Sequence, residues 1–287
     1  GAFDFVSKPV DLQRLRDLVN AALKLKFEKQ EPVTEQGDSP ILGHSPLIKK
    51  LQVQIKKLAR SQAPVYINGE SGSGKELVAR EIHRLGPRAE GPFIPVNCGA
   101  IPSELMESEF FGHKKGSFTG AVENKQGLFR SADGGTLFLD EIAEMSASLQ
   151  TRLLRVLEDG RIRRLGGKKE FQVDVRVLAA TNRDPRSAVE EGQLREDLYY
   201  RLNVFTIHLP ALRTRKSDIP LLVQYFISAF NQKHHLKVQG LREDVLERLR
   251  AYSWPGNVRE LKNVMERASV LAKEKWIENT HLPPYIQ

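Results

Sequence analysis

The sequence predicts an α/β fold built on a parallel β-sheet, followed by a small all-helical subdomain. Apolar strand candidates alternate with helical patterns over residues 41–210, which is typical of a parallel sheet covered on both faces. A glycine-rich segment at residues 69–75 directly follows one of these strands and opens a helix. After Pro210 no strand candidate remains. Amphipathic helical patterns then occupy residues 217–234, 241–252 and 257–272.

Each strand candidate is a short apolar run, as expected for a strand buried on both faces of a sheet. The first run leads into the glycine-rich segment, and a helix is expected after it, over residues 75–85. The predicted strands are residues 64–68, 93–96, 136–139, 174–180 and 204–209.

The first forty residues read as a separate region. Residues 1–9 predict a strand end and a loop, and Asp11 is placed to cap a helix that runs to about Lys29. An apolar stripe along this helix fits either a dimerising coiled coil or a helix packed on another domain. The stripe consists of Leu15, Leu18, Ala22 and Leu25. Residues 30–40 are polar, contain two prolines and predict a linker. The predicted division of the chain is 1–29, 30–40, 41–210 and 211–287.

Composition excludes several classes of protein. The 287 residues are 40% hydrophobic and 28% charged, which is ordinary globular composition. No apolar run reaches the roughly 18 residues of a membrane helix, and no secretory signal is present. The single cysteine, Cys98, excludes an internal disulfide and a cysteine-rich metal site. We therefore expect a cytoplasmic protein without membrane contact and, since the chain begins without Met, a piece of a longer one.

The charge balance is basic, with 44 Lys and Arg against 36 Asp and Glu and a formal charge of +8. Such an excess indicates either a nucleic-acid surface or a solvated surface with basic residues grouped around an anionic ligand. The second interpretation is favoured, because the basic residues are spread along the chain without a run of five like charges.

The glycine-rich segment has the composition and the setting of a phosphate-binding loop. Its glycines let backbone N–H groups turn toward phosphates, and the start of the following helix adds partial positive charge. Lys75 would neutralise the terminal phosphates of ATP, whereas Glu76 occupies the position where Ser or Thr usually holds Mg²⁺. A glycine-rich turn without a ligand is the alternative, which the strand–loop–helix setting disfavours. The predicted loop residues are Gly69, Glu70, Ser71, Gly72, Ser73, Gly74 and Lys75.

Two acidic residues end the strand predicted at 136–139. Because parallel strands end at the ligand crevice, Asp140 and Glu141 would face the phosphates. Asp140 could hold Mg²⁺ through water, and Glu141 could polarise the attacking water. Acids often simply terminate strands, so this motif becomes specific only with the phosphate loop upstream. Asn182, after the fourth strand, is placed to sense the terminal phosphate or to orient the water, with a turn-forming Asn as the alternative.

The order of these motifs resembles that of the AAA+ P-loop ATPases, which combine a parallel sheet with a helical lid. More narrowly, residues 116–121 resemble the GAFTGA loop of bacterial enhancer-binding proteins, NtrC-like response regulators that activate RNA polymerase carrying sigma-54. Glu76 is usual in this family, whereas Ser117 replaces the usual Ala and is small enough that we expect the loop to work. The loop residues are Gly116, Ser117, Phe118, Thr119, Gly120 and Ala121. The resemblance covers residues 41 to about 285 and includes segments 70–80, 109–113, 195–202 and 254–261.

The resemblance implies roles for residues around the nucleotide of one subunit. Ile41 and Gly43 would lie against the adenine, and Arg259 would contact a phosphate from the lid. Asn97 would hold Glu141 in a resting position and release it when nucleotide binds. The implied nucleotide-binding set is completed by Glu76 and Leu77.

Further roles implied by the resemblance depend on assembly. Arg195 and Arg201 would reach the ATP of a neighbouring subunit as arginine fingers, since a planar guanidinium suits the charge of phosphoryl transfer. Phe118 and Thr119 would touch the sigma factor from the loop tip. By composition alone, an Arg in a helix is usually a surface residue, and Phe118 would more often be tucked into the core.

The resemblance also implies partners beyond these residues. Residues 1–9 resemble the last strand and Lys-Pro turn of receiver domains, in which Lys8 would contact the phosphoryl group. The family normally continues into a helix-turn-helix DNA-binding domain. The implied partners are sigma-54 of RNA polymerase, further copies in a dimer or in a hexameric or heptameric ring, a sensor kinase and enhancer DNA, with ATP and Mg²⁺ as cofactors. Similarity around residues 60–120 points to a regulator of type IV pilin.

Two other functions remain open from the residues. A nucleotide-gated DNA-binding or scaffold protein would bind ATP without turnover, against which Glu141, Arg195 and the 116–121 loop argue. A different AAA+ machine, such as an unfoldase or a helicase loader, would lack that loop.

Overall fold

The structure, a computed structural model, describes residues 41–118, 121–273 and 275–286. The elements predicted for residues 1–40, including Lys8, lie outside the described residues, as do Thr119 and Gly120 of the predicted loop. Within the described ranges, no helix is long and apolar enough to cross a membrane.

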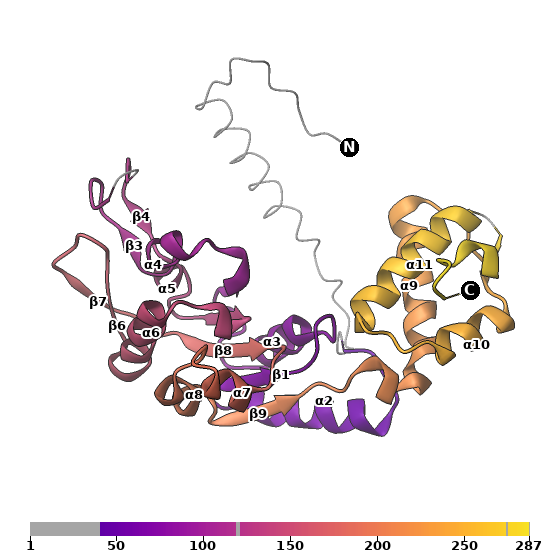
Figure 1. The fold of residues 1–287 in the computed structure, drawn as a ribbon, viewed down its shortest axis with the longest axis horizontal. Helices are drawn as coiled ribbons and strands as arrows, with labels where there is room; N and C mark the ends of the chain where they lie inside the picture. The colour runs from indigo at the N-terminus through magenta and orange to yellow at the C-terminus, as the bar shows by residue number, and fades with distance from the viewer. Residues whose placement is uncertain (1–40, 119–120, 274, 287) are drawn as a thin grey trace, which may run out of the picture. The chain divides into compact units, whose positions relative to one another are not determined.

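A five-stranded parallel sheet forms the centre of the α/β part (Figure 1). Its strand order is β2-β5-β8-β1-β9, and every neighbouring pair is parallel. The five predicted strands are confirmed, with bounds that shift by one or two residues. They are β1 (Val65–Asn68), β2 (Phe93–Asn97), β5 (Thr136–Asp140), β8 (Arg176–Thr181) and β9 (Phe205–His208). Because the strands run the same way, their carboxyl ends meet at one edge, where Asn68 pairs with Thr181 and Asn97 with Asp140.

Each face of the sheet has its own apolar core, because successive side chains of a strand point to opposite faces. Val65 and Ile67 of β1 pack in one core, whereas Tyr66 between them packs in the other. The sheet is therefore covered on both faces, as predicted. The first core includes residues of α2 (Pro46–Ala59) and α3 (Lys75–Arg84). The second includes residues of α4 (Ser103–Phe111), α5 (Leu128–Ser131), α6 (Ala147–Asp159), α7 (Pro185–Glu190) and α8 (Glu196–Leu202).

Two small antiparallel hairpins extend from the α/β part at the same end (Figure 1). The hairpins touch, because Lys114 N donates to Leu165 O (3.1 Å) and Leu165 N donates to Gly112 O (3.0 Å). Sequence patterns do not predict either one, since strands of two or three residues are too short to show periodicity. The first hairpin is β3 (Gly112–His113) with β4 (Lys125–Gln126), and the second is β6 (Arg161–Arg163) with β7 (Glu170–Gln172).

The C-terminal subdomain packs around a third core, in which the Trp254 side chain is fully buried. Its three predicted helices are confirmed. The prediction that it is all-helical is wrong in one detail, because Gly240–Leu241 (β10) and Trp276–Ile277 (β11) form a short parallel pair. The Trp276 ring lies 3.0 Å from where a Cβ of Gly240 would be, so a larger residue there would press against the ring. The helices are α9 (Ile219–His234), α10 (Glu243–Ala251) and α11 (Asn257–Ala272).

Candidate nucleotide site

The predicted phosphate loop connects β1 to the start of α3. Gly72 and Gly74 have φ angles of 75° and 107°, which L side chains rarely adopt, so the loop needs glycine at both positions. Lys75 is only 7% exposed, and its Nζ donates to Gly69 O (2.9 Å) and Glu70 O (3.4 Å). Ser73 Oγ is buried without a hydrogen-bond partner in the described part of the chain. The loop therefore holds a buried ammonium and an unpaired hydroxyl at a helix N-terminus, which is a setting for anions.

Glu76 and Leu77, the next two predicted binding residues, are not buried beside the phosphate loop as Lys75 is. The Glu76 carboxylate pairs with Arg80 one turn further along α3, at 2.7 Å, and Leu77 is exposed. The α3 helix begins at Lys75 behind Gly74, which offers no side chain to cap its amides. These amides are therefore left for an anionic ligand.

Asp140 and Glu141 follow at the carboxyl end of β5, as predicted. Burial lowers the pKa of Lys75, and the charges of Asp140 and Glu141 oppose that shift, which places both carboxylates within electrostatic reach of the ammonium. Asp140 Oδ1 accepts a hydrogen bond from Glu141 N (3.1 Å). Glu141 has φ 55° and ψ 48°, a left-handed conformation that costs free energy in a non-glycine residue. Such strain often marks functional positions.

Asn97 lies beside the acidic pair, because β2 and β5 are neighbours and Asn97 is opposite Asp140. A Cβ on Gly99 would lie 2.9 Å from Glu141 Oε2 and 3.5 Å from Asn97 Oδ1, so both side chains approach this glycine. The structure gives no hydrogen bond between Asn97 and Glu141, both of which it describes. Asn182 is exposed at the end of β8, beside the ends of β1 and β5.

The segment predicted to contact the adenine is fastened by a residue that the sequence does not single out. Asp218, just before α9, accepts hydrogen bonds from His44 N (2.7 Å), Ser45 N (2.8 Å) and Ser45 Oγ (2.6 Å). A Cβ on Gly43 would lie 2.9 Å from Asp218 Oδ2, so a larger residue there would displace the carboxylate. Ile41 is buried. Asp218 thus ties the segment after residue 40 to the start of the lid.

A second group of lid residues holds the phosphate loop itself. Both oxygens of Glu70 accept hydrogen bonds from the Arg213 guanidinium, one of them from Nη1 at 2.7 Å. Asn257, fully buried at the start of α11, donates to Glu70 Oε2 (3.0 Å) and Ser71 O (3.1 Å) and accepts from Leu212 N (2.8 Å). We call Glu70, Arg213 and Asn257 the loop clasp. The hydrogen bonds from Arg213 and then Asn257 lower the pKa of Glu70 to about 2.

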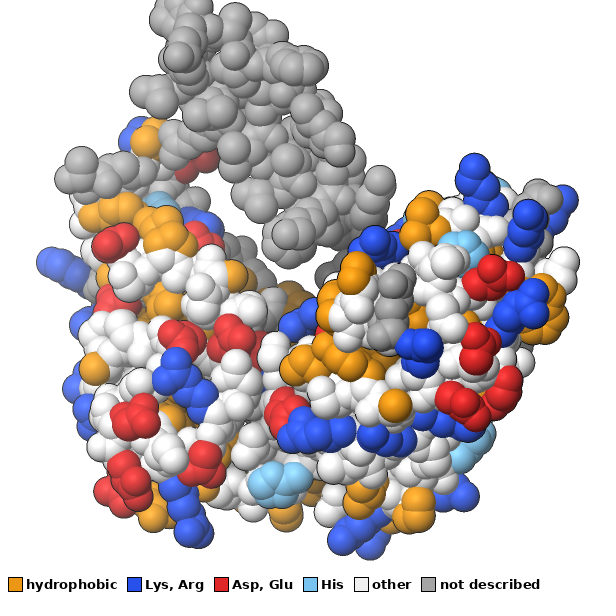
Figure 2. Space-filling model, turned by 45° about the vertical axis from the view of Figure 1, so that its right-hand side comes forward, with side chains coloured by type: hydrophobic (Ala, Val, Ile, Leu, Met, Phe, Trp, Pro, Cys, Tyr) orange, Lys and Arg blue, Asp and Glu red, His pale blue; other side chains and the backbone are white. Residues whose placement is uncertain are grey.

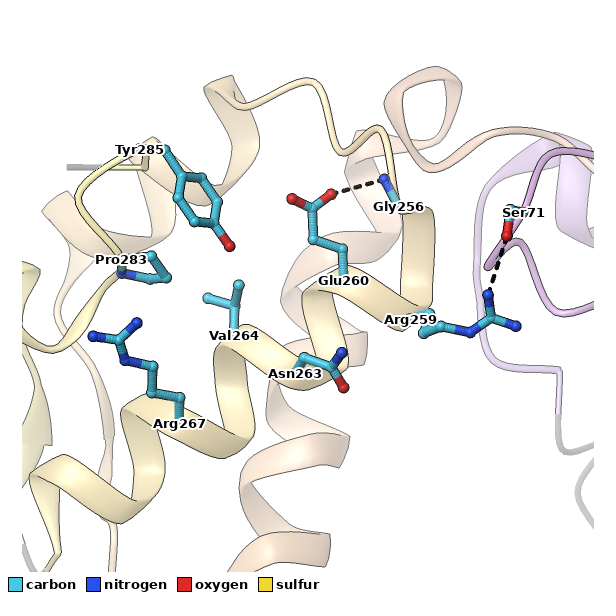
Figure 3. A pocket seen from close by; sticks show the side chains of 9 residues that line it. All are labelled: Ser71, Gly256, Arg259, Glu260, Asn263, Val264, Arg267, Pro283 and Tyr285. Carbon is cyan, nitrogen blue, oxygen red and sulfur yellow. Dashed lines mark hydrogen bonds between the residues drawn. The ribbon is translucent and has the colours of Figure 1, made fainter.

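Arg259 extends the same contact between the lid and the phosphate loop. Its backbone N donates to Gly72 O (3.2 Å), and its Nη1 donates to Ser71 Oγ (3.1 Å; Figure 3). A Cβ on Gly72 would lie 2.2 Å from Gly256 O, so the lid backbone approaches the loop more closely than a side chain would allow. Sequence reasoning identified Arg259 but missed Arg213, Asn257 and Gly256, whose types are common in turns and on surfaces.

A cavity of about 480 Å³ continues from this contact along α11. Ser71 and Arg259 lie at its edge, and Arg267, Pro283 and Tyr285 surround its other end (Figure 3). Glu260 on its wall accepts a hydrogen bond from Gly256 N (2.8 Å), which fixes the first turn of α11. The cavity therefore adjoins the phosphate loop on its lid side.

The two predicted arginine fingers lie in and next to α8. Arg195 pairs with Asp197 at 2.7 Å, and Arg201 Nη2 donates to Leu157 O (2.9 Å). Both side chains are exposed. Neither is bonded to the phosphate loop within the ranges that the structure describes, so one chain by itself does not bring them to its own site.

The loop of residues 116–121 connects β3 to β4. Gly116 N donates to Ala121 O (2.8 Å), which closes its base, and Gly116 has a φ of 78°. Phe118 is 39% exposed, and its ring meets His113 edge-on with centroids 5.0 Å apart. Phe118 is thus not tucked into a core. Ser117 Oγ is buried without a hydrogen-bond partner among the described residues.

Taken together, the parallel sheet, the phosphate loop and the helical lid define a P-loop nucleotide-binding protein. Residues 41–208 match the Sigma-54 interaction domain, and residues 213–287 match the AAA+ ATPase lid domain. The chain belongs to the sigma-54 interaction domain family of AAA+ ATPases.

Individual relatives support this assignment. The response regulator protein PilR of Pseudomonas aeruginosa is 56% identical over 278 residues, covering 97% of this chain and 62% of PilR. The crystal structure of NtrX from Brucella abortus in complex with ATP has a TM-score of 0.81 and 38% identity, covering 100% of this chain and 63% of NtrX. The same protein in complex with ADP gives a TM-score of 0.80 and 37% identity. The chain thus spans less than two thirds of the length of these relatives.

Proposed function

We propose that this chain binds and hydrolyses ATP in order to remodel the closed promoter complex of sigma-54 RNA polymerase. The main observation behind this proposal is that Lys75, Asp140 and Glu141 share one edge of the sheet, while the lid holds the phosphate loop beside them. An ammonium, two carboxylates and a row of free amides are the groups that phosphoryl transfer requires.

Nucleotide binding is supported by the chemistry of the loop. The triphosphate would take over the Lys75 ammonium from the carbonyls of Gly69 and Glu70. It could also accept the hydrogen bond that the buried Ser73 hydroxyl does not make with the described residues. NtrX, whose fold this chain shares, is known with ATP and with ADP bound.

Magnesium fits the acidic pair rather than the start of α3. Glu76 pairs with Arg80, so Asp140 is left to hold Mg²⁺ together with phosphate oxygens. The described residues contain no group of three carboxylate, His or Cys side chains that could cage a metal, and Mg²⁺ with ATP needs only one or two carboxylates. When bound, Mg²⁺ would neutralise charge on the phosphates.

Hydrolysis would use Glu141 to accept a proton from the attacking water, with Asn97 restraining Glu141 until nucleotide binds. Asn182 would orient the water, and Ile41 and Gly43 would lie against the adenine. Arg195 and Arg201 would act on the ATP of a neighbouring copy in a ring. Their exposure, and the absence of any bond from either to the phosphate loop of the chain as described, support that assignment.

The remaining partners follow from family membership. Phe118 and Thr119 would contact sigma-54, with the exposed Phe118 ring as the described part of that surface. In the whole protein, a receiver that includes Lys8 would take a phosphoryl group from a sensor kinase, and a further domain would bind enhancer DNA. The similarity to the response regulator protein PilR supports a response regulator, and regulation of type IV pilin stays a prediction.

A complementation experiment tests the chemistry and the assembly together. Lys75→Ala should lose ATP binding yet keep both arginines, whereas Arg201→Ala should bind ATP yet lack a finger. Each variant alone should release little phosphate, and an equimolar mixture should recover a substantial part of the rate, because mixed interfaces unite an intact loop with an intact finger. A mixture as inactive as its components would contradict fingers supplied between subunits. Wild-type protein that binds ATP but releases no phosphate would instead indicate a nucleotide-gated binding protein.

The sigma-factor contact is tested separately. Thr119→Ala should leave ATP turnover largely intact and abolish retention of purified sigma-54 in the presence of an ATP transition-state mimic. Equal loss of both activities would assign Thr119 to the nucleotide site.

A further inference from the structure

The β6–β7 hairpin carries a dense group of basic residues. Basic and acidic side chains are interspersed over the face shown in Figure 2, as on an ordinary solvated surface. Residues 161–169, in contrast, contain five cations and no acid. These cations are Arg161, Arg163, Arg164, Lys168 and Lys169.

Most of this charge has no acidic partner within the chain. Arg161 is 4.0 Å from Glu170, at the limit of an ion pair, while the structure gives the other four cations no ion pair with any residue that it describes. Arg163 and Lys168 are exposed. Exposed like charges this close repel one another, and this repulsion is relieved when a polyanion binds.

The Phe171 ring lies among three cations of this region, of which Arg130 lies outside the hairpin. The guanidinium carbons of Arg130 and Arg164 lie 5.0 and 5.3 Å from the Phe171 ring centroid, and Lys169 Nζ lies 5.6 Å from it. Phe171 is only partly buried. Basic side chains arranged around a partly exposed aromatic ring are a common feature of nucleic-acid surfaces.

The hairpin is also fixed to the loop that would engage the sigma factor. Leu165 of the hairpin exchanges backbone hydrogen bonds with the first hairpin on either side of His113, and a Cβ on Gly166 would lie 2.7 Å from Ser117 Cβ. Lys114 and Lys115, both exposed, therefore add two cations beside the hairpin. We call the hairpin cations together with Lys114 and Lys115 the basic surface.

We infer that the basic surface binds the phosphate backbone of DNA next to the sigma-factor loop. Unpaired cations supply the sequence-independent attraction, and the contact with Ser117 places it beside Phe118. The inference rests on the proposed function, because the DNA in question is the promoter that the polymerase holds. Binding to DNA phosphates itself requires neither ATP nor sigma-54, so it can be measured apart from that function.

Salt-dependent binding of a short labelled DNA duplex, measured by fluorescence anisotropy, tests the inference. Arg163→Gln with Lys168→Gln removes two exposed cations that make no side-chain bond within the described residues. If both contact phosphates, the slope of log affinity against log salt should become shallower by about two, and affinity should fall roughly tenfold per contact near 0.1 M salt. Arg248→Gln with Arg250→Gln on the exposed side of α10 removes the same charge from a helix that also carries Glu243, Asp244 and Glu247, and it should change neither quantity.

Four outcomes distinguish the interpretations. A hairpin variant that binds DNA as the α10 variant does and still retains purified sigma-54 would overturn the inference and leave the hairpin as a solvated surface. A variant that keeps DNA binding but loses retention of purified sigma-54 would overturn it in favour of an acidic protein partner. Loss of DNA binding with unchanged phosphate release would support it, while failure of the wild type to hydrolyse ATP would count against the proposed function alone.

Discussion

Asn257→Asp should weaken the loop clasp while leaving the other residues of the nucleotide site unchanged. The substitution keeps the size of the side chain and the oxygen that accepts from Leu212 N, but it replaces the donor to Glu70 and Ser71 with an acceptor. Asn257 has a φ of 52°, which Asp tolerates better than most residues, so the backbone should stay in place.

The size of the effect on the contact between lid and loop follows from the groups that face the new carboxylate. Losing two donated hydrogen bonds, one of them to a carboxylate, costs about 2–4 kcal/mol. Two unit charges about 3 Å apart add about 5 kcal/mol of repulsion at an effective dielectric constant of about 20. Solvent reduces that term strongly, because the Glu70 side chain is 42% exposed, and Arg213 still neutralises Glu70. We expect a net cost of about 2–4 kcal/mol in the contact between lid and loop.

Titration with a fluorescent ATP analogue measures the consequence. If the clasp sets the loop position, the variant should bind the analogue roughly 10–100-fold more weakly near pH 8, as about 1.4 kcal/mol corresponds to tenfold. The Glu70 carboxylate should raise the pKa of the new carboxyl above the value of about 3.9 in the unfolded chain. Below that raised pKa the new carboxyl is protonated and no longer repels Glu70. The loss of affinity for the ATP analogue should therefore shrink as the pH falls toward about 5. Glu70 stays ionised there, since its pKa of about 2 lies far lower.

Asn263→Asp is the matched control. It makes the same chemical change on the same helix, at an exposed residue that lines the cavity but has no hydrogen bond to the phosphate loop in the chain as described. Wild-type affinity in Asn257→Asp near pH 8, or an equal defect in Asn263→Asp, would refute the idea that the clasp positions the loop.

Three more predictions concern single side chains. Glu141→Gln should retain ATP while phosphate release falls by about 10²–10⁴-fold, because the amide cannot accept the proton of water; release near the wild-type rate would remove Glu141 as the base. Ser117→Ala should stabilise the base of its loop by about 1–2 kcal/mol, because a buried hydroxyl without a partner disappears, and slower hydrogen exchange of the loop amides would show it. Arg213→Gln should raise the pKa of Glu70 from about 2 toward its usual value, since Arg213 is the main cause of the depression. The stabilisation that ionised Glu70 contributes is lost as pH falls through its folded-state pKa, so this variant should lose ATP affinity at a higher pH than the wild type, and coincident acid profiles would contradict this.

The sequence by itself determined the architecture and where most of the candidate nucleotide-site residues lie. Strand–loop–helix order located residues 69–75, and the apolar run before Asp140 placed two acids at the same sheet edge, because parallel strands end together. These features are local in the chain, and their periodicity and residue types are sufficient to detect them. The two-residue β10 and β11 strands, whose pairing joins the connection after α9 to the segment after α11, left no such pattern.

Only the tertiary structure decided how the lid holds the phosphate loop. Glu70 meets Arg213 and Asn257 across 143 and 187 residues of chain, and Ser117 meets Gly166 across two hairpins too short to predict. A lone Glu, Arg or Asn carries no signal of its partner, because a hydrogen bond between distant residues depends on how the helices and the sheet pack. The loop clasp and the basic surface exist only once that packing brings their residues together.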